Sequence, residues 1–280
     1  MKTYRFVDTT EVSENNPSSI HTNIDNKRLE NEIKGFQTLN VTGREMIGRE
    51  IQSRKYSSTQ AGSKSRTSTN SSAGFGSNKI ISSNLTSRTL SVEFYLENRN
   101  SREARFAWEK LNLLINKQEV EIWFSDDPEY FYTGTLINVG DVNPSVDSVI
   151  SRFYYECMDP FKYRRSIQWW KFDNNGEFLQ ISTYPVRIES IDITPKRSTK
   201  MIKLVNETNG NFLQVDHDFK AGDILTFDLL NGKVLLNKSR DITGKLYWFS
   251  DFEDFSLSFR DLLKTNIDSN VVVNYRRKAL

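Results

Sequence analysis

The segment Ser125-Asp-Asp-Pro-Glu-Tyr-Phe-Tyr-Thr-Gly134 predicts an acidic turn that leads into an aromatic β-strand. The side chains of Asp126 and Asp127 can bond their own backbone, and Pro128 fixes φ and ends any preceding strand. Further along, Phe153-Tyr-Tyr-Glu-Cys-Met-Asp-Pro-Phe-Lys-Tyr163 predicts a strand that stops at Asp159-Pro160. Proline cannot donate to a sheet ladder, and the residue before it is disfavoured in a helix. Both segments therefore indicate a β-rich fold.

The residues before this region predict strands and one helix. Phe36–Gly43 and Glu119–Phe124 have the pattern of strands, and Thr86–Leu96 alternates apolar and polar residues like a half-buried strand. Asn100 can cap a helix, with Glu103 in a capping-box position. The helix would carry one apolar stripe, which we expect to pack on the sheet of its own domain rather than on a neighbouring subunit. Its members are Ala104, Trp108, Leu111, Leu114 and Ile115. Residues 1–35 are polar and predict irregular structure.

Residues 52–78 have a different composition from the rest of the chain, with nine serines, three threonines and three glycines. No carboxylate occurs from Ile51 through Val92. Such a segment has little apolar surface to bury, so by itself it predicts a solvated loop. A loop of this length inside a compact domain is uncommon unless it has a function, so an arm that becomes ordered on contact is an equal alternative.

The second half of the chain predicts an all-β domain. Asn175-Gly176, Asn209-Gly210 and Asn231-Gly232 each lie between apolar or alternating runs. Asn-Gly tolerates the positive φ of tight hairpin turns, so these pairs predict an antiparallel meander. Two such sheets stacked face to face would form a sandwich.

The acidic turn, the aromatic strand and the strand ending in Asp-Pro, in this order, resemble the distal tail protein family of long-tailed phages. Leu39-Asn-Val-Thr-Gly-Arg44 and Ala221-Gly-Asp-Ile-Leu-Thr-Phe-Asp228 also fit that family. The resemblance implies a mainly β protein with a ring-forming N-terminal domain at 1–165, holding one packed helix and an extended arm at about 52–78. It also implies a C-terminal galectin-like antiparallel β-sandwich at 166–280.

In function, the resemblance implies a structural virion protein, the hub that joins the tail tube to the baseplate of a siphophage tail tip. Six copies would form a ring, in which the arm reaches a neighbouring subunit. Partners would be the tail tube protein, a tail-associated lysin or tip protein, and receptor-binding or other baseplate proteins. The protein would be made in the host cytoplasm and would lie at the distal end of the tail in the virion. As interface residues we expect Arg54, Lys55, Lys64, Arg66 and Phe75.

Composition narrows the classes of function. A chain of 280 residues suits two domains, and 38 basic against 36 acidic residues leave no overall field for binding nucleic acid. The single cysteine, Cys157, excludes an internal disulfide and has the pattern of a small core residue. No run of about 18 apolar residues predicts a membrane span, and the first residues lack the apolar region of a signal peptide.

We expect neither catalysis nor a cofactor. His21 and His217 are the only histidines, and Asp216-His217-Asp218 is most simply a solvated turn rather than a metal site. With one cysteine and two distant histidines, the chain has no zinc-site spacing. Asp126 and Asp127 are adjacent, so on a strand they would point to opposite faces and could not share a substrate as paired carboxylates.

Two other kinds of binding are alternatives. Trp169-Trp170 and Tyr247-Trp-Phe249 could stack saccharides of the host cell wall, although adjacent aromatics on a strand face opposite ways and one of each pair should be core. The residue pattern by which galectins hold sugar is not found. The basic segment could contact nucleic acid, but its aromatic residues are few, and we expect no specific binding. Its positive charges are Arg54, Lys55, Lys64, Arg66, Lys79 and Arg88.

Overall fold

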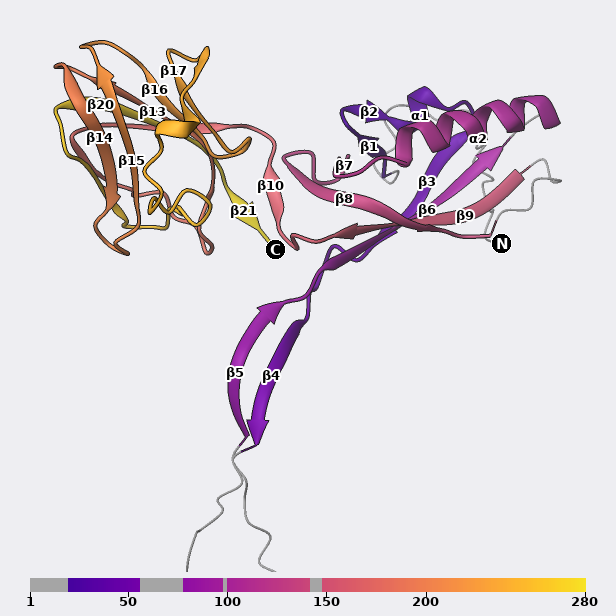
Figure 1. The fold of residues 1–280 in the computed structure, drawn as a ribbon. Helices are drawn as coiled ribbons and strands as arrows, with labels where there is room; N and C mark the ends of the chain where they lie inside the picture. Colours follow the sequence, from indigo (N-terminus) through magenta and orange to yellow (C-terminus); the bar gives the residue numbers. More distant parts are fainter. Residues whose placement is uncertain (1–19, 56–77, 98–99, 142–147) are drawn as a thin grey trace, which may run out of the picture. The chain divides into compact units, whose positions relative to one another are not determined.

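The computed structural model describes residues 20–55, 78–97, 100–141 and 148–280. Contacts divide the chain into two compact units. The first unit holds the residues up to Val120 together with Thr133–Pro160, and the second holds Glu121–Tyr132 and Phe161–Leu280. The expectation of a mainly β protein is confirmed, because strands dominate both units (Figure 1).

The elements up to Pro160 are β1 (Thr22–Ile24), β2 (Lys27–Arg28), α1 (Leu29–Glu32), β3 (Phe36–Thr42), β4 (Arg49–Lys55), β5 (Asn78–Leu85), β6 (Arg88–Glu97), α2 (Ser101–Ile115), β7 (Val120–Phe124), β8 (Tyr130–Val139) and β9 (Ser148–Cys157). The later elements are β10 (Lys162–Arg164), β11 (Gln168–Asp173), β12 (Asn175–Glu177), β13 (Arg187–Pro195), β14 (Thr199–Asn206), β15 (Phe212–Phe219), β16 (Leu225–Asp228), β17 (Lys233–Leu236), β18 (Arg240–Asp241), the 3-10 helix η1 (Thr243–Lys245), β19 (Leu262–Thr265), β20 (Ser269–Arg276) and β21 (Lys278–Ala279).

The first unit is built around the antiparallel strands β8, β9, β6 and β3, in that order. β6 pairs with β9 over its whole length, from Arg88 opposite Cys157 to Glu97 opposite Ser148. The alternating pattern predicted for β6 is confirmed, because every second side chain is fully buried. These buried residues are Leu90, Val92, Phe94 and Leu96.

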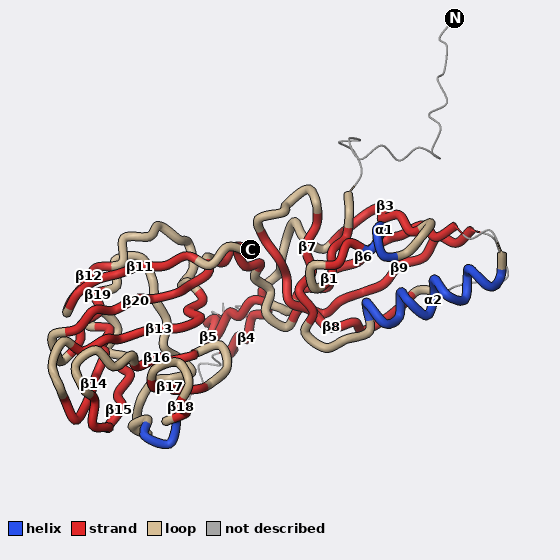
Figure 2. The backbone as a smooth tube through the Cα atoms, turned by 90° about the horizontal axis from the view of Figure 1, so that it is seen from above, coloured by secondary structure: helices blue, strands red, loops and turns tan. Residues whose placement is uncertain are grey.

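Helix α2 packs on this apolar face of the sheet (Figure 2). Its start is as predicted: the side chain of Asn100 accepts a hydrogen bond from the backbone N–H of Glu103, at 2.9 Å. At its other end, the hydroxyl of Tyr155 in β9 donates to the carbonyl of Ile115, at 2.9 Å. Burial raises the pKa of this tyrosine, so the hydroxyl stays protonated and keeps its role as donor.

The prediction of irregular structure up to residue 35 is wrong for the described residues. Asp25 and Asn26 both adopt positive φ and form the turn between β1 and β2, and α1 follows directly. The scattered apolar residues of this segment, Ile24, Leu29 and Ile33, are all buried. Leu29 and Ile33 lie one turn apart at the two ends of α1, whereas Ile24 lies in β1, so these short elements contain too few residues to show a period.

The second unit contains the predicted sandwich. One antiparallel sheet has the order β11-β20-β13-β16-β17-β18, and the other has the order β12-β19-β14-β15. Their inner faces share one hydrophobic core, so the two sheets pack face to face. This core includes Ile191, Ile193, Ile202, Leu204, Val271 and Val273.

Two of the three Asn-Gly pairs form the predicted hairpin turns. Gly210 lies between β14 and β15, Gly232 lies between β16 and β17, and both have positive φ. The prediction is wrong for Asn175-Gly176, which lies within β12. A Cβ at Gly176 would lie 2.6 Å from Cγ of Phe172 and 2.8 Å from the ring of Trp170, so glycine is required there by close packing rather than by a turn.

Candidate assembly surfaces

The acidic turn has a structural role in the second unit. The backbone N–H of Asp127 donates to the carbonyl of Phe124, and that of Tyr130 donates to the carbonyl of Asp127. The carboxylate of Asp127 lies 2.6 Å from Nζ of Lys162 in β10, which also lies over the ring of Tyr130. Asp126 is exposed beside it, and Pro128 follows in the turn. The turn is thus tied to β10.

The corner at Asp159-Pro160 is held by Arg88 at the start of β6. Its guanidinium donates to the carbonyls of Pro160, Gly43 and Arg44, at 2.9, 2.9 and 2.6 Å. The side chain is only 2 % exposed. Arg88 therefore links three backbone segments of the first unit, and it is not one of the cations that a nucleic acid could reach.

The remaining reactive groups are inert or isolated. Cys157 is buried, and loss of hydration raises the pKa of its thiol to about 12, so it is no thiolate nucleophile near neutral pH. His217 lies in strand β15 rather than in the predicted turn, with its ring edge-on to Phe219. Burial lowers the pKa of His21, although the nearby Glu30 carboxylate acts in the opposite direction.

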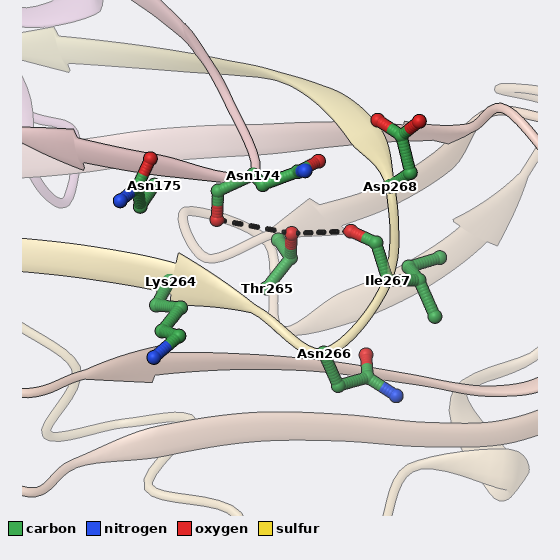
Figure 3. A pocket seen from close by; sticks show the side chains of 7 residues that line it. All are labelled: Asn174, Asn175, Lys264, Thr265, Asn266, Ile267 and Asp268. Atoms are coloured by element: carbon green, nitrogen blue, oxygen red, sulfur yellow. Dashed lines mark hydrogen bonds between the residues drawn. The ribbon is translucent and has the colours of Figure 1, made fainter.

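Within the described ranges, no three His, Cys, Asp or Glu residues come together as a metal site. A hollow of about 380 Å³ lies at the end of β19 in the second unit (Figure 3). Thr265 is one of its lining residues, and its hydroxyl lies 3.2 Å from the carbonyl of Asn174 and 2.8 Å from that of Ile267. None of the helices that the structure describes is long and apolar enough to cross a membrane.

Strands β4 and β5 form a two-stranded sheet of their own (Figure 1). The ends of the segment 52–78 are therefore strand rather than loop, since Gln52–Lys55 continue β4 and Asn78 begins β5. Two of the expected interface residues, Arg54 and Lys55, have their backbone in β4. The others, Lys64, Arg66 and Phe75, lie outside the described residues.

Helix α2 buries one apolar face and exposes two large apolar residues on the other side. Leu111 and Ile115 are buried, and Trp108 is half-buried with its ring edge-on to Phe94, at 6.1 Å between ring centroids. On the opposite side, Phe106 is 58 % exposed and Leu113 is 74 % exposed. Seven residues apart, they lie on the same side of a helix. From the sequence we predict only the longer, buried stripe and not this pair of exposed residues. The signal for the pair was the seven-residue spacing between Phe106 and Leu113.

The face of the first unit's sheet that points away from the buried side chains also carries large residues. Tyr95 of β6 is opposite Ile150 of β9, and Tyr154 lies further along β9 on the same face. Glu93 and Arg152 form an ion pair between them, at 2.8 Å. Ile150 is exposed and both tyrosines are half-exposed, so this face is mixed aromatic, aliphatic and charged.

The second unit exposes tryptophans at two places. In β11, Trp170 packs on the core whereas Trp169 faces outward, as expected for adjacent residues of a strand. Between η1 and β19, Trp248 is 80 % exposed and the neighbouring Phe249 is 58 % exposed. Here neither aromatic is core, because the residues form a turn rather than a strand: the N–H of Ser250 donates to the carbonyl of Tyr247.

Comparisons with known proteins place these features in a family. The family model described as phage tail protein RIFT-related domain matches residues 34–153. The model described as siphovirus-type tail component, C-terminal domain, matches residues 181–278. No curated protein matched the chain.

Solved structures share the fold. The crystal structure of the SPP1 Dit (gp 19.1) protein, described as a paradigm of hub adsorption apparatus in Gram-positive infecting phages, has a TM-score of 0.70 at 19% identity. The matched region covers 93% of this chain and 99% of the SPP1 Dit chain. The baseplate of phage P2 in its activated conformation with calcium has a TM-score of 0.53 at 9% identity, covering 93% and 97% of the two chains.

The two family models together match most of both units. The β4–β5 pair lies within residues 34–153, the range that the RIFT-related model matches. The chain therefore belongs to the siphophage distal tail protein family and is a structural protein of the phage tail and baseplate.

Proposed function

We propose that this protein is the hub at the distal end of a siphophage tail, where it joins the tail tube to the baseplate. Six copies form a closed ring through residues 1–165. A closed ring needs heterologous contacts, in which one surface of a subunit meets a different surface of its neighbour. The hub acts by position and contact, so it requires neither a cofactor nor catalysis.

The observation that carries this proposal is the isolated β4–β5 pair. A two-stranded sheet without a further partner is marginally stable in water, because it has no hydrophobic face to bury. β4 and β5 pair only with each other among the described strands, and Ile51 in β4 is exposed. We infer that a neighbouring subunit supplies the missing surface, and that the arm of about 52–78 makes this contact.

The first unit offers further surface for such contacts. Phe106 and Leu113 on α2 and Ile150 on the sheet face are large apolar residues that are exposed in the single chain. Large exposed aliphatic and aromatic side chains are typical of surfaces that become buried on association.

We assign the attachment of other proteins to the second unit. Residues 166–280 would provide the surface to which receptor-binding or other adhesion proteins attach. The ring would contact the tail tube protein and a tail-associated lysin or tip protein. We also propose that the protein is made in the host cytoplasm and lies at the distal end of the tail in the virion.

The direct test is the native mass of the purified full-length chain, followed by negative-stain imaging. We expect a hexamer with a six-fold ring in projection. A protein that stays monomeric at all concentrations, alone and in the presence of tail tube protein, would refute the hub proposal.

A variant tests the role of the hairpin. Residues 50–84 are replaced by Asn-Gly, which joins Arg49 directly to Leu85, its cross-strand partner. We expect an unchanged melting temperature and loss of the ring, because β4 and β5 pair with no other described strand. A second variant retains β4 and β5 and replaces only residues 56–77 with a short Gly-Ser linker. Rings formed by this variant but not by the excised one would assign the contact to the paired strands, whereas loss of rings in both would assign it to residues 56–77 of the arm. If the excised variant still forms rings, the hairpin is not the contact.

Binding of host cell-wall saccharides by the second unit is the alternative function. The exposure of Trp248 on this unit favours it, since an exposed tryptophan is a flat apolar surface with a polar edge. It is compatible with the hub role, because a hub at the tail tip would lie close to the host surface.

A further inference from the structure

The turn Tyr247–Ser250 presents the rings of Tyr247, Trp248 and Phe249, which form a cluster with the ring of Phe212 in strand β15. We name these four rings the aromatic platform. The ring centroids of Trp248 and Phe249 are 4.0 Å apart, and those of Tyr247 and Phe249 are 5.8 Å apart. Tyr247 in turn lies 6.3 Å from Phe212 on the neighbouring strand β15. The rings therefore form one continuous group.

The backbone holds this platform firmly against the edge of β15. The N–H of Tyr247 donates to the carbonyl of Gln214 at 2.8 Å, and Oγ of Ser250 accepts from the N–H of Gln214 at 3.0 Å. The N–H of Asp251 donates to the carbonyl of Phe212, and its carboxylate accepts from the N–H of Phe212, both at 2.9 Å. The exposed rings are thus carried by a turn that is fixed at both ends, and little ordering is required when a ligand binds.

Polar side chains border the platform on the same face of the sheet. Lys203 is the cross-strand partner of Gln214, and its ammonium lies 4.1 Å from the centroid of the Phe212 ring. The amide of Gln214 donates to the carboxylate of Asp216 at 3.2 Å. All three side chains alternate with buried residues, so they point away from the core.

We infer that the aromatic platform binds a saccharide chain. This inference rests on the saccharide-binding role proposed above for the second unit, and it assigns the site. A sugar ring has a face of C–H groups that can stack on the electron-rich face of an aromatic ring, and a rim of hydroxyls that both donate and accept. The platform supplies the stacking faces, and Lys203, Gln214 and Asp216 supply donors and acceptors beside them, as in most small-ligand sites.

A protein partner fits the platform less well. Stable protein interfaces bury at least about 1,000 Å² and have a core depleted of charged residues. The platform consists of four rings, and charged or amide side chains directly adjoin it.

The test titrates soluble hexasaccharides of glucose, N-acetylglucosamine and rhamnose into the full-length protein, monitored by tryptophan fluorescence and by saturation-transfer NMR. We expect at least one of them to bind. The substitution Trp248→Ala should weaken that binding roughly tenfold or more, as when a central aromatic contact is removed. Gln214→Ala should weaken it less and tests the polar border.

The matched control is Trp169→Ala, which removes another exposed tryptophan of the same unit that also has a lysine ammonium, that of Lys171, over its ring. It should leave binding within about twofold of the parent. Equal melting temperatures of the three variants and the parent would show that all are folded, as expected for exposed positions.

Three results would overturn the inference: none of the hexasaccharides binds at millimolar concentration, Trp248→Ala binds like the parent, or Trp169→Ala abolishes binding. If no saccharide binds and Trp248→Ala changes the native mass of the assembly, the platform is a protein interface instead. The native mass of the parent is measured in the same samples. A ring without saccharide binding rejects only this site, whereas saccharide binding by a monomer rejects only the hub.

Discussion

The second unit closes its core between two sheets, whereas the first unit covers one face of its sheet with α2 and leaves large side chains on the other. In the second unit, both sheets contribute buried residues to one cluster. In the first unit, Ile150 and the α2 stripe of Phe106 and Leu113 are exposed, and the β4–β5 pair has no neighbour among the described strands. The second unit thus closes its core between its own two sheets, whereas the first unit exposes the surfaces on which the proposed ring depends.

The largest effect should come from Phe94→Ala in the first unit. Phe94 is fully buried and contacts the rings of Phe36, Trp108 and Phe153. Its loss should cost about 3–5 kcal/mol of the free energy of unfolding. Calorimetry of the full-length protein should show a lower melting temperature for one transition only.

The control for that change is Phe227→Ala, which removes an equally buried phenylalanine from the second unit. It should destabilise the other transition by a similar amount and leave ring formation intact. If both substitutions shift the same transition, the two units do not unfold independently, and the comparison between them fails.

The next effect concerns Arg88, which joins three segments of the first unit. Arg88→Leu leaves three carbonyls without their charged donor and should cost about 2–3 kcal/mol. Denaturant titration measures this value. Arg152→Ala removes an exposed arginine paired with Glu93 and should cost much less, because solvent screens an exposed ion pair. Equal costs for the two substitutions would mean that Arg88 does not join these segments as described.

Trp108→Ala should have a smaller effect than Phe94→Ala. Trp108 is half-buried on the sheet, so its loss should cost about 1–3 kcal/mol in the isolated chain. Melting temperature and native mass, measured together, separate core from interface. A variant that melts like the parent but no longer assembles would place Trp108 in a subunit contact instead.

The smallest effect near neutral pH is a pH dependence of the first unit, which develops only above about pH 9. Burial raises the pKa of Cys157 from the ordinary value of 9.0 to about 12. The neutral thiol is therefore favoured in the folded state, and its contribution to stability is complete below pH 9 and is lost as pH rises towards 12. Stability measured from pH 8 to 11 should fall less steeply in Cys157→Ala than in the parent. Parallel curves would show that the thiol is hydrated in the folded protein.

Local patterns in the sequence were sufficient to predict much of this fold. Three predictions are confirmed because each depends on neighbours within a few residues. They are the alternation in β6, the Asn100 cap of α2 and two of the Asn-Gly turns. The resemblance of the acidic turn and of the Asp159-Pro160 strand to distal tail proteins likewise agreed with the family models.

Other features depend on residues that are far apart in the chain. Asn175-Gly176 was expected to form a turn, but it lies in β12, whose partner strand β19 begins at Leu262. Arg88 was counted as a loop cation because its acceptors, Gly43, Arg44 and Pro160, are over forty residues away in sequence. Burial and hydrogen bonding between distant segments carry no local period, so no pattern in the sequence could indicate them, and they became visible only in the packed structure.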